Sequence, residues 1–445
     1  MSQIVMQNLS DIFIDHLYRI VQDGVPEAVR EQARLCLLDY LACAIGGARM
    51  MDIETQNFFD VVAPQGGNVS VIGFDKKTTL NNAAFIQAVN VHATELDDGH
   101  RLGMIHLGAS IISALLPVAE VENLSNEDVL MGIVVGYEAA IRTAMAMQPS
   151  HKVRGYHTSG TCGTIGSAMA IASAMRLPKQ AMKTALAAAT ASASGLLELQ
   201  EDESQLKPYN LAHAAVGGIT AAYAAKTGFI GPKDPLGGKR GLLAVMSENA
   251  KAEPLIDFST VPFEIMRIYR KPYAACRHCH PGIEAALWLK EKHNLNPEDI
   301  ASIDVDTYKL AVAGHDHTEI QGIASAKLST PFSVALALYR NTANLTDFCQ
   351  ETISDKAILT LTQKVNVHIN DELTSWSPQK RAAIVKITTF QGDAFCHEVD
   401  FPKGEPENPM SFKELKEKFY ELAKFNLLTK KESDSILSKI VEIKL

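Results

Sequence analysis

The chain of 445 residues is 47% hydrophobic and 21% charged, which is typical of a globular protein of roughly two or three domain-sized units. Its formal net charge of -9 argues against a general nucleic-acid binder, because such a protein needs a basic surface to displace counterions. An anionic substrate would have to be attracted by a local cationic pocket, because the electrostatic field of a protein with a negative net charge repels anions.

The cysteine content and the N-terminus predict a soluble protein. Seven cysteines are spread along the chain, and this odd number does not suit a disulfide framework in a protein of this length. Residues 1–10 contain no basic start followed by an apolar stretch, and no uninterrupted apolar run reaches the roughly 20 residues that span a bilayer. We therefore expect a cytoplasmic protein that binds neither a membrane nor nucleic acid.

The N-terminal half of the sequence predicts helices. Apolar residues recur at helical spacing over residues 9–21, and a second helix should end at Gly46-Gly47. A short strand or extended segment is expected over residues 69–74. From about 80 to 230 the pattern is almost entirely helical, with Ala-, Ser- and Gly-rich stretches whose small side chains allow close helix packing. These features predict a large all-helical domain.

The pattern changes after Pro262. Alternating apolar and polar residues predict strands, and segments of helical periodicity separate them. The predicted strands cover residues 303–307, 365–369 and 383–390, and the predicted helices cover residues 282–292 and 331–339. Residues 411–444 return to helical periodicity. The sequence thus predicts a mostly α protein with an α+β part.

A first group of titratable side chains lies in residues 92–106, where three carboxylates and three imidazoles occur within fifteen residues. The group consists of His92, Glu95, Asp97, Asp98, His100 and His106, together with Arg101. Neighbouring carboxylates raise one another's pKa, and a nearby acid raises the pKa of a histidine, so such a cluster suits acid–base chemistry. A solvated helix end is one alternative. A metal site is another, although the segment has no HExxH pattern and no second set of ligands.

A second group surrounds His157. Residues 154–160 form a Gly- and hydroxyl-rich loop that leads into a helix, and N–H groups at a helix start attract carboxylates. Nucleotide binding is not indicated, because neither a preceding strand nor a Gly-Lys-Ser/Thr sequence is present. An N-capped helix with a surface histidine is the alternative. Lys207, ahead of an apolar helix, would alone be a solvated charge and matters only beside these groups.

A third group, residues 271–281, contains the pattern Cys-x-x-Cys-His at residues 276–280. Haem attachment needs an export route that the sequence does not indicate, and a zinc site needs further ligands. A thioredoxin-like motif needs a different strand–helix context. The interpretation left is that histidine and arginine side chains enter a cleft at a domain junction, where small-molecule sites are common.

Together these groups resemble the MmgE/PrpD family, which includes 2-methylcitrate dehydratase, cis-aconitate decarboxylase and iminodisuccinate epimerase. The matching pieces run in family order: residues 92–101 with His106, residues 155–166, Lys207 with the helix that leads into residues 228–232, residues 271–286, and residues 404–419. The resemblance implies a large helical domain, residues 1–265 and 400–445, and a smaller inserted α+β lid domain, residues 266–399. It also implies a homodimer, no cofactor and no metal, and an active site in the cleft between the two domains.

The resemblance also assigns candidate site residues. Asp97 and Asp98 match the family's acidic pair, His106 the histidine after it, His157 the loop histidine, Lys207 the basic residue before the Ala-rich helix, and His280 the histidine of the lid hinge. The residues expected to contribute to substrate binding are Glu95, Arg101, Tyr156 and Arg277. Two features depart from the family pattern: Thr158 follows the loop histidine where many relatives have proline, and Cys276 with Cys279 makes an unusual hinge.

The implied enzyme is a lyase that removes or adds a proton next to a carboxylate of a small di- or tricarboxylic acid. Such a proton is weakly acidic, so its removal needs a positioned base and cationic groups that stabilise the developing charge. The candidate base and acid are His106 and His157, and Asp97 with Asp98 would orient an imidazole or handle a leaving hydroxyl. Lys207, the hinge histidine and an arginine would hold carboxylates.

A hydro-lyase acting on a 2-methylcitrate-like acid is the favoured prediction. A decarboxylase of the cis-aconitate type and an epimerase of an amino-dicarboxylate of the iminodisuccinate type are alternatives, because all three share one proton-transfer half-reaction. A non-catalytic binder on the same scaffold is disfavoured, since every candidate group is retained. The sequence leaves open which histidine is the base and which the acid.

Overall fold

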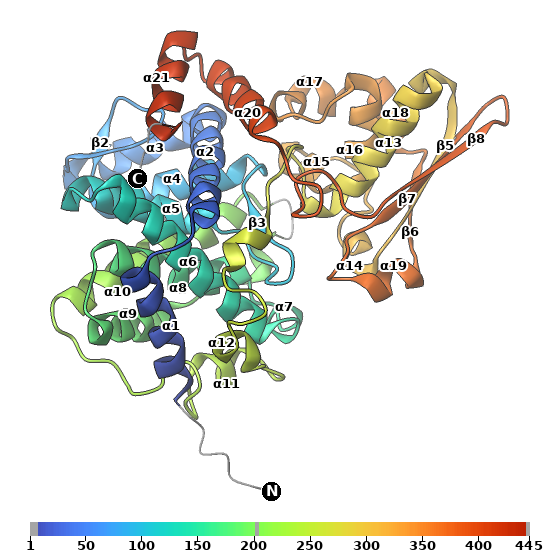
Figure 1. The fold of residues 1–445 in the computed structure, drawn as a ribbon. Coiled ribbons are helices and arrows are strands. Elements are labelled where there is room, and N and C mark those ends of the chain that lie inside the picture. The colour runs from blue at the N-terminus through green and yellow to red at the C-terminus, as the bar shows by residue number, and fades with distance from the viewer. Residues whose placement is uncertain (1–7, 201–203, 442–445) are drawn as a thin grey trace, which may run out of the picture. The chain divides into compact units, whose positions relative to one another are not determined.

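The computed structural model describes residues 8–200 and 204–441, which divide into two compact units (Figure 1). Of the described residues, the first unit comprises 8–200, Leu206–Ile268 and 412–441. The second unit comprises 204–205 and Tyr269–Ser411. The first unit is almost entirely helical, whereas the second combines helices with a four-stranded sheet. The prediction of a mostly α protein with an α+β part is confirmed. The assignment of a body and an inserted lid stays a prediction.

Helices and very short strands make up the first unit. Its N-terminal elements are α1 (Leu9–Asp23), α2 (Glu27–Met50), α3 (Asp52–Val62), η1 (Ala63–Gln65), β1 (Val69–Ser70), β2 (Lys77–Thr78), α4 (Leu80–Ala93) and β3 (Gly99–His100). The central helices are α5 (Gly108–Glu122), α6 (Asn126–Met147), α7 (Ser150–Val153), α8 (Thr158–Ala174), α9 (Lys179–Ser192), η2 (Leu197–Gln200) and α10 (Lys207–Lys226). The unit ends with α11 (Leu242–Met246), α12 (Glu253–Ile256), η3 (Glu264–Arg267) and the C-terminal α20 (Phe412–Phe425) and α21 (Lys430–Val441).

Helices α6 and α8 form the centre of the first unit. Every residue of α8 is buried, as is most of α6. A Cβ atom at Gly136 of α6 would lie 2.8 Å from the carbonyl oxygen of Gly166 on α8. Even alanine at this position would push the helices apart, so the glycines set how closely the two backbones approach. The prediction that small residues serve close helix packing is confirmed.

Helix α2 does not end at Gly46-Gly47, as predicted, but continues to Met50. A Cβ atom at Gly47 would lie 1.9 Å from the carbonyl oxygen of Asn90 on α4, and one at Gly46 would lie 2.7 Å from Cδ2 of Leu422 on α20. The two glycines therefore allow α4 and α20 to pack closely against α2. Close packing, and not helix termination, explains their presence.

Among the described residues, α6 is the one helix long and apolar enough to cross a membrane, judged by length and composition alone. Its most apolar window is 89% buried inside the protein. The helix begins with a capping box, in which the Ser125 hydroxyl accepts from the N–H of Asp128 and the Asp128 carboxylate accepts from the N–H of Ser125. Such burial is that of a helix in the core of a globular unit.

A four-stranded sheet and its helices make up the second unit. The strands are β5 (Ile300–Thr307), β6 (Val365–Ile369), β7 (Ala383–Thr389) and β8 (Ala394–Val399), and β4 (Ile268–Tyr269) lies at the boundary between the units. The helices are η4 (Arg277–Cys279), α13 (His280–His293), η5 (Pro297–Asp299), α14 (Lys309–Val312), α15 (Ile323–Leu328), α16 (Thr330–Arg340), η6 (Leu345–Asp347), α17 (Gln350–Ile353), α18 (Lys356–Thr362) and α19 (Asp371–Trp376).

The sheet of the second unit has the strand order β6-β5-β7-β8. Strand β5 runs parallel to β6 and antiparallel to β7, so Val305 lies opposite both Val367 and Val385. Parallel strands need a long crossover, and helices α14 to α18 supply it. Helix α13 packs against β7 and β8, and α16 against β6 (Figure 1). Val385 and Ile387 are buried while Lys386 between them is exposed, as expected for a sheet with one covered face.

Most predicted elements are confirmed. The alternating segments are strands β5, β6 and β7, and the predicted helical segments are α13, which precedes β5, and α16, which lies between β5 and β6. The extended segment expected over residues 69–74 contains the two-residue strand β1. Helices α20 and α21 confirm the helical C-terminus up to residue 441. Residues 442–444 of that prediction, and residues 1–7 of the N-terminal segment, lie outside the described residues.

Candidate active site

Three helices of the first unit begin close to one another. The backbone N–H of His106, just before α5, donates to Oγ of Ser159 in the first turn of α8 at 3.0 Å. The ring of His157, the N-cap residue of α8, contacts the side chain of Asn210 in the first turn of α10 at 2.9 Å. The starts of α5, α8 and α10 therefore meet. Because the N-terminal end of a helix carries partial positive charge, this meeting point attracts anions.

Asn210 fixes the tautomer of His157. Its Nδ2 atom lies 3.1 Å from the carbonyl oxygen of Leu196 and 2.9 Å from Nδ1 of His157. A carbonyl oxygen can only accept, so the atom that faces Leu196 is the NH2 group, and its second hydrogen is donated to the imidazole. In the neutral ring of His157, Nδ1 therefore carries the lone pair and Nε2 carries the proton.

The surroundings of His157 favour its neutral form. Burial lowers its pKa well below the ordinary value, and the charges of His92, Lys207 and His106 lower it further. Two contacts connect the segments that carry the histidines: the N–H of His106 donates to Ser159, two residues after His157, and the ring of His106 lies 4.9 Å from that of His92. A neutral imidazole with its proton on Nε2 is a hydrogen-bond donor, which can stabilise negative charge on a bound molecule.

His106 has the opposite tautomer. Its Nδ1 lies 2.9 Å from the backbone carbonyl oxygen of Asp98, which can only accept, so Nδ1 carries the proton. The lone pair of the neutral ring then lies on Nε2, which makes this nitrogen the candidate base. The His106 side chain is 17% exposed, whereas that of the adjacent His92 is 0% exposed. Solvent therefore reaches the side chain of His106 but not that of His92.

Asp97 connects two imidazoles. Nδ1 of His92 donates to Oδ2 of Asp97 at 2.7 Å, and the same oxygen lies 3.6 Å from Nδ1 of His106. The two rings are 4.9 Å apart, edge to face. This arrangement suits the orienting role predicted for the acidic pair. Within residues 8–200 and 204–441, Nε2 of His92 is buried without a hydrogen-bond partner.

His92, Asp97 and His106 also form a group that could hold a metal ion, because one ligand atom of each lies within 4.8 Å of the others. The protons of both imidazoles, however, lie on Nδ1 and are directed at oxygen atoms of Asp97 and Asp98. An ion bound between those nitrogens and the carboxylate would have to displace the protons. The Nδ1 contacts of the two rings are therefore those of a hydrogen-bond network.

The carboxylate of Asp98 joins three elements. Its Oδ1 accepts from the N–H of Gly108 at the start of α5 at 2.9 Å, and its Oδ2 accepts from the hydroxyl of Tyr137 on α6 at 2.6 Å. Burial raises the pKa of Asp98 to about 6, although these two hydrogen bonds act in the opposite direction. The side chain thus fixes the segment after α4, while its backbone carbonyl orients His106.

Lys207, the first residue of α10, forms an ion pair with Glu95. Glu95 has a φ of 55°, a left-handed conformation that a residue other than glycine rarely adopts and that is often found at functional sites. Lys418 of α20 supports the same turn, because its Nζ donates to the carbonyl oxygen of Leu96 and to the carboxylate of Asp39 on α2, each at 2.7 Å. Helix α20 therefore helps to hold Glu95 where it meets Lys207.

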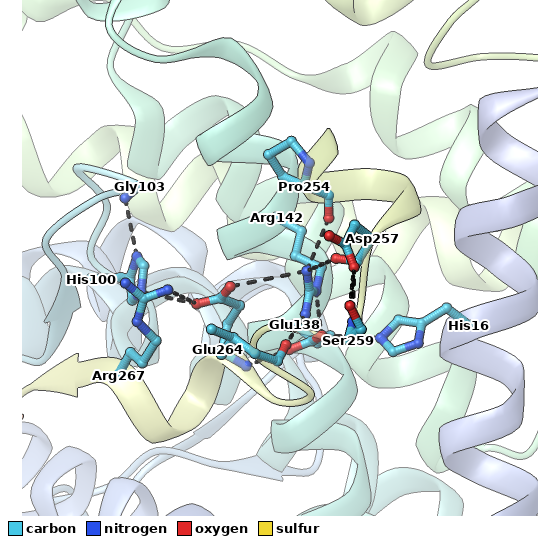
Figure 2. A network of polar contacts seen from close by, with 11 residues as sticks. His16, His100, Gly103, Glu138, Arg142, Pro254, Asp257, Ser259, Glu264 and Arg267 are labelled. Atoms are coloured by element: carbon cyan, nitrogen blue, oxygen red, sulfur yellow. Dashed lines mark hydrogen bonds and ion pairs between the residues drawn. The ribbon is translucent and has the colours of Figure 1, made fainter. Parts of the chain in front are cut away.

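His100 belongs to a separate buried network (Figure 2). Its Nδ1 accepts from the N–H of Gly103 at 3.1 Å, and its Nε2 lies 3.4 Å from the carboxylate of Glu264. The backbone N–H of Glu264 donates to Glu138 on α6 at 2.7 Å, and Glu138 pairs with Arg142. These contacts tie β3 and η3 to α6. His100 thus supports the segment that carries the candidate site.

Arg101 and Tyr156 are the two other residues of the first unit for which substrate binding was predicted. Arg101 follows His100 and is 8% exposed. The ring of Tyr156 stacks on that of His151, with 4.8 Å between the ring centres, and its backbone pairs with Leu196. Their roles toward a substrate stay predictions.

Arg277 and His280 lie in the second unit, where they bind each other. Nη1 of Arg277 donates to Nδ1 of His280 at 2.9 Å, and the guanidinium also donates to Glu405 and to the carbonyl oxygens of residues 402 and 403. Nε2 of His280 donates in turn to the carbonyl oxygen of Ala275 at 3.2 Å. Both side chains hold the hinge segment together. Their meeting with the groups of the first unit stays a prediction.

Several residues of the site were missed by sequence reasoning. Asn210 follows Lys207 by three residues, so the spacing Lys-x-x-Asn at a helix start was an available signal for a shared face. Ser159 and Tyr137 offer no such local signal, because their partners lie 53 and 39 residues away in the sequence.

The chain belongs to the MmgE/PrpD family. Residues 14–255 match the MmgE/PrpD N-terminal domain and residues 273–442 match the MmgE/PrpD C-terminal domain. The resemblance inferred from the five sequence pieces is thereby confirmed.

Three curated relatives are named cis-aconitate decarboxylase. That of Aspergillus terreus is 25% identical over 427 residues, which cover 91% of this chain and 87% of the relative. That of Mus musculus is 21% identical over 430 residues, which cover 94% of this chain and 87% of the relative. That of Homo sapiens is 23% identical over 239 residues, or 52% of this chain and 49% of the relative.

Replacing Asn210 by aspartate is expected to raise the pKa of His157. A carboxylate accepts a proton from Nδ1 and stabilises the imidazolium, whereas the native amide donates to Nδ1. If activity requires neutral His157, the loss of activity on acidification should then begin at a higher pH than in the unaltered protein. NMR titration of the His157 ring and the pH profile of kcat measure the two effects.

Asn81→Asp is the matched control, because Asn81 is exposed on α4 and the substitution adds the same charge. It should change neither the titration of His157 nor the pH profile. An Asn210→Asp protein whose His157 titrates as before would show that the assigned tautomer is wrong.

Proposed function

We propose that the protein is a lyase that removes or adds a proton next to a carboxylate of a small di- or tricarboxylic acid. The observation that carries this proposal is a pair of neighbouring histidines with opposite tautomers: a lone pair on Nε2 of His106 and a proton on Nε2 of His157. The first nitrogen can take a proton from carbon while the second donates a hydrogen bond to the substrate. Membership of the MmgE/PrpD family supports the same class of reaction.

The meeting point of α5, α8 and α10 suits an anionic substrate despite the net charge of -9. A substrate carboxylate placed there would be stabilised by the three helix starts and by Lys207, for which it would compete with Glu95. Removal of the neighbouring proton creates enediolate-like charge on that carboxylate. The same donors would stabilise this charge more strongly than the charge of the ground state, which is the requirement for catalysis.

A hydro-lyase reaction on a 2-methylcitrate-like acid is the favoured form of the proposal. His106 takes the proton from the carbon next to a carboxylate, and the bond between the adjacent carbon and its hydroxyl oxygen breaks as the double bond forms. The proton on His106 then converts the leaving hydroxide into water. One imidazole can therefore serve as base and as acid.

Decarboxylation of a cis-aconitate-type acid is the second candidate, because curated relatives with 21–25% identity are named cis-aconitate decarboxylases. In that reaction a carbon–carbon bond breaks, carbon dioxide leaves, and an imidazolium at His106 supplies the proton to the carbon that retains the electron pair. Both reactions use the same residues and differ in the bond that breaks.

The remaining expectations from the family resemblance belong to the same proposal. We propose that His280 and Arg277 of the second unit help to complete the site, and that the protein works as a cytoplasmic homodimer without a cofactor. Gel filtration with light scattering measures the oligomeric state, and a monomer would contradict that part of the proposal.

The proposed function is tested by incubating the purified chain, before and after removal of metal ions, with hydroxy, unsaturated and amino di- and tricarboxylic acids in deuterated water. Alkene absorbance, carbon dioxide release and deuterium uptake are followed together. Alkene formation without carbon dioxide identifies a hydro-lyase, and carbon dioxide release identifies a decarboxylase. Deuterium exchange with inversion, without loss of water or carbon dioxide, identifies an epimerase.

Two results would contradict the proposal. Folded protein that transforms none of the acids and exchanges no substrate proton would remove its basis. Activity that is lost on metal removal and returns only with a divalent ion would show that the expectation of a cofactor-free reaction is wrong.

A further inference from the structure

The second unit contains a group of metal-ligand side chains that the proposed reaction does not use. Cys276 and His278 belong to the Cys-x-x-Cys-His segment, for which a zinc site would need further ligands. In the structure His315, 39 residues after Cys276, lies beside them. One ligand atom from each of the three side chains lies within 4.8 Å of the other two. The fold therefore supplies a third ligand that the sequence motif alone does not.

The spacing of these atoms suits a shared zinc ion. Sγ of Cys276 lies 3.8 Å from Nε2 of His315. A sulfur and a nitrogen that bind one tetrahedral zinc ion at about 2.3 Å and 2.0–2.1 Å are about 3.6 Å apart. The observed distance is therefore close to that of the bound state, so a small adjustment of side chains would accommodate an ion.

His315 is oriented as a metal ligand usually is. Its Nδ1 lies 2.7 Å from the carbonyl oxygen of Leu328, which can only accept, so Nδ1 carries the proton of the neutral ring. The Nε2 lone pair then faces the sulfur of Cys276. A metal-bound histidine almost always donates its other N–H to such a partner, which fixes the ring and its tautomer.

His278 and Cys276 are positioned by neighbours as well. Nδ1 of His278 lies 2.5 Å from the hydroxyl of Tyr308, and a hydroxyl can either accept or donate a hydrogen bond. When it accepts from Nδ1, the Nε2 lone pair of His278 becomes available to an ion. The backbone N–H of Cys276 donates to the carbonyl oxygen of Lys327 at 2.8 Å, which holds the thiol beside the two rings.

Cys279, the second cysteine of the motif, serves a different purpose. It is buried, its Sγ lies 3.7 Å from the carbonyl oxygen of Leu328, and it accepts from the hydroxyl of Thr330 at 3.4 Å. The three grouped side chains, in contrast, are partly exposed. A site of three protein ligands that solvent can reach leaves a fourth position for water or an external ligand.

We propose that Cys276, His278 and His315 form a binding site for a zinc-like divalent cation within the second unit. The site has mixed sulfur and nitrogen ligands, which suit zinc better than magnesium or calcium. The proposal concerns binding and is independent of the proposed reaction.

The test uses the full chain after removal of metal ions. Titration with Zn2+ against a chromophoric chelator should show one tight site per chain, and Co2+ should give a thiolate-to-metal absorption band. Zinc should also protect Cys276 from iodoacetamide. Cys276→Ser and His315→Gln should each weaken zinc binding by at least about tenfold, because loss of even an outer partner of a metal ligand costs 10–100-fold.

Cys396→Ser and His368→Gln are matched controls, since both residues are exposed on the sheet of the same unit. They should bind zinc as the unaltered chain does, and thermal unfolding checks that every variant is folded. Zinc binding that is equally tight in Cys276→Ser would identify adventitious surface binding and overturn the proposal. Absence of one-to-one binding by the folded, unaltered chain would overturn it as well.

Discussion

The His106→Asn variant is expected to remain folded and to lose about 10²–10⁴-fold in kcat, the contribution typical of a general base. The asparagine amide can still donate to the backbone carbonyl of Asp98 from near the position of Nδ1, but it has no equivalent of Nε2. The variant therefore separates the structural hydrogen bond from the proposed chemistry. Steady-state kinetics on the substrate found by the product screen measure the loss.

His213→Asn is the control for this variant. His213 is exposed on α10, the helix that begins at Lys207, and it contacts the ring of Tyr209. Its replacement should leave kcat unchanged. A loss of activity in His106→Asn of less than about tenfold would be smaller than the contribution of a general base. The base would then lie elsewhere, and the tautomer of His106 would not explain the reaction.

The Arg142→Met variant is expected to lose about 3–5 kcal/mol of unfolding free energy, the cost of leaving a buried charge without its partner. The guanidinium pairs with Glu138 and donates to the carbonyl oxygens of Pro254 and Asp257, and the side chains of the ion pair are 2% and 1% exposed (Figure 2). Methionine approximates the volume but leaves the buried carboxylate of Glu138 without its guanidinium partner. Urea denaturation followed by circular dichroism measures the change.

Arg176→Met provides the comparison. Arg176 pairs with Asp128 of the same helix α6 at 2.8 Å, but its side chain is 65% exposed. An exposed pair of this kind contributes about 0–1 kcal/mol, so the loss should be much smaller. Equal losses in the two variants would mean that burial of the Arg142 network does not determine its contribution.

Periodicity predicted most of the fold because it reflects which face of an element is buried. The strands around Val305, Val367 and Val385 were found from their alternation, and the alternation exists because one face of the sheet is covered. The end of α2 was predicted wrongly at Gly46-Gly47, since glycine stops helices but also permits close contact between them. Only the position of Asn90 on another helix distinguishes the two uses.

The candidate site was predictable where its residues are close in sequence. His106 and its acidic neighbours, with His157, could be grouped by type and spacing. The tautomers of the two histidines could not be predicted, because they depend on Asn210 and on the backbone carbonyl of Asp98, and only the folded chain defines where these groups lie. Asp98 shows the same limit: its carboxylate binds Tyr137 and Gly108, and its backbone carbonyl is the part that contacts an imidazole.

The starts of α5, α8 and α10 should attract an anionic ligand even when the side chains around them change in evolution. Attraction that comes from peptide dipoles has no protonation state, and exchanging a single side chain cannot remove it. The part of the affinity for a carboxylate ligand that comes from these dipoles should accordingly not depend on the protonation of any side chain, while the rate of the proposed reaction follows the protonation of the imidazoles. Substitutions of side chains can thus change which bond of a substrate is cleaved while the anion-attracting meeting point of α5, α8 and α10 stays unchanged.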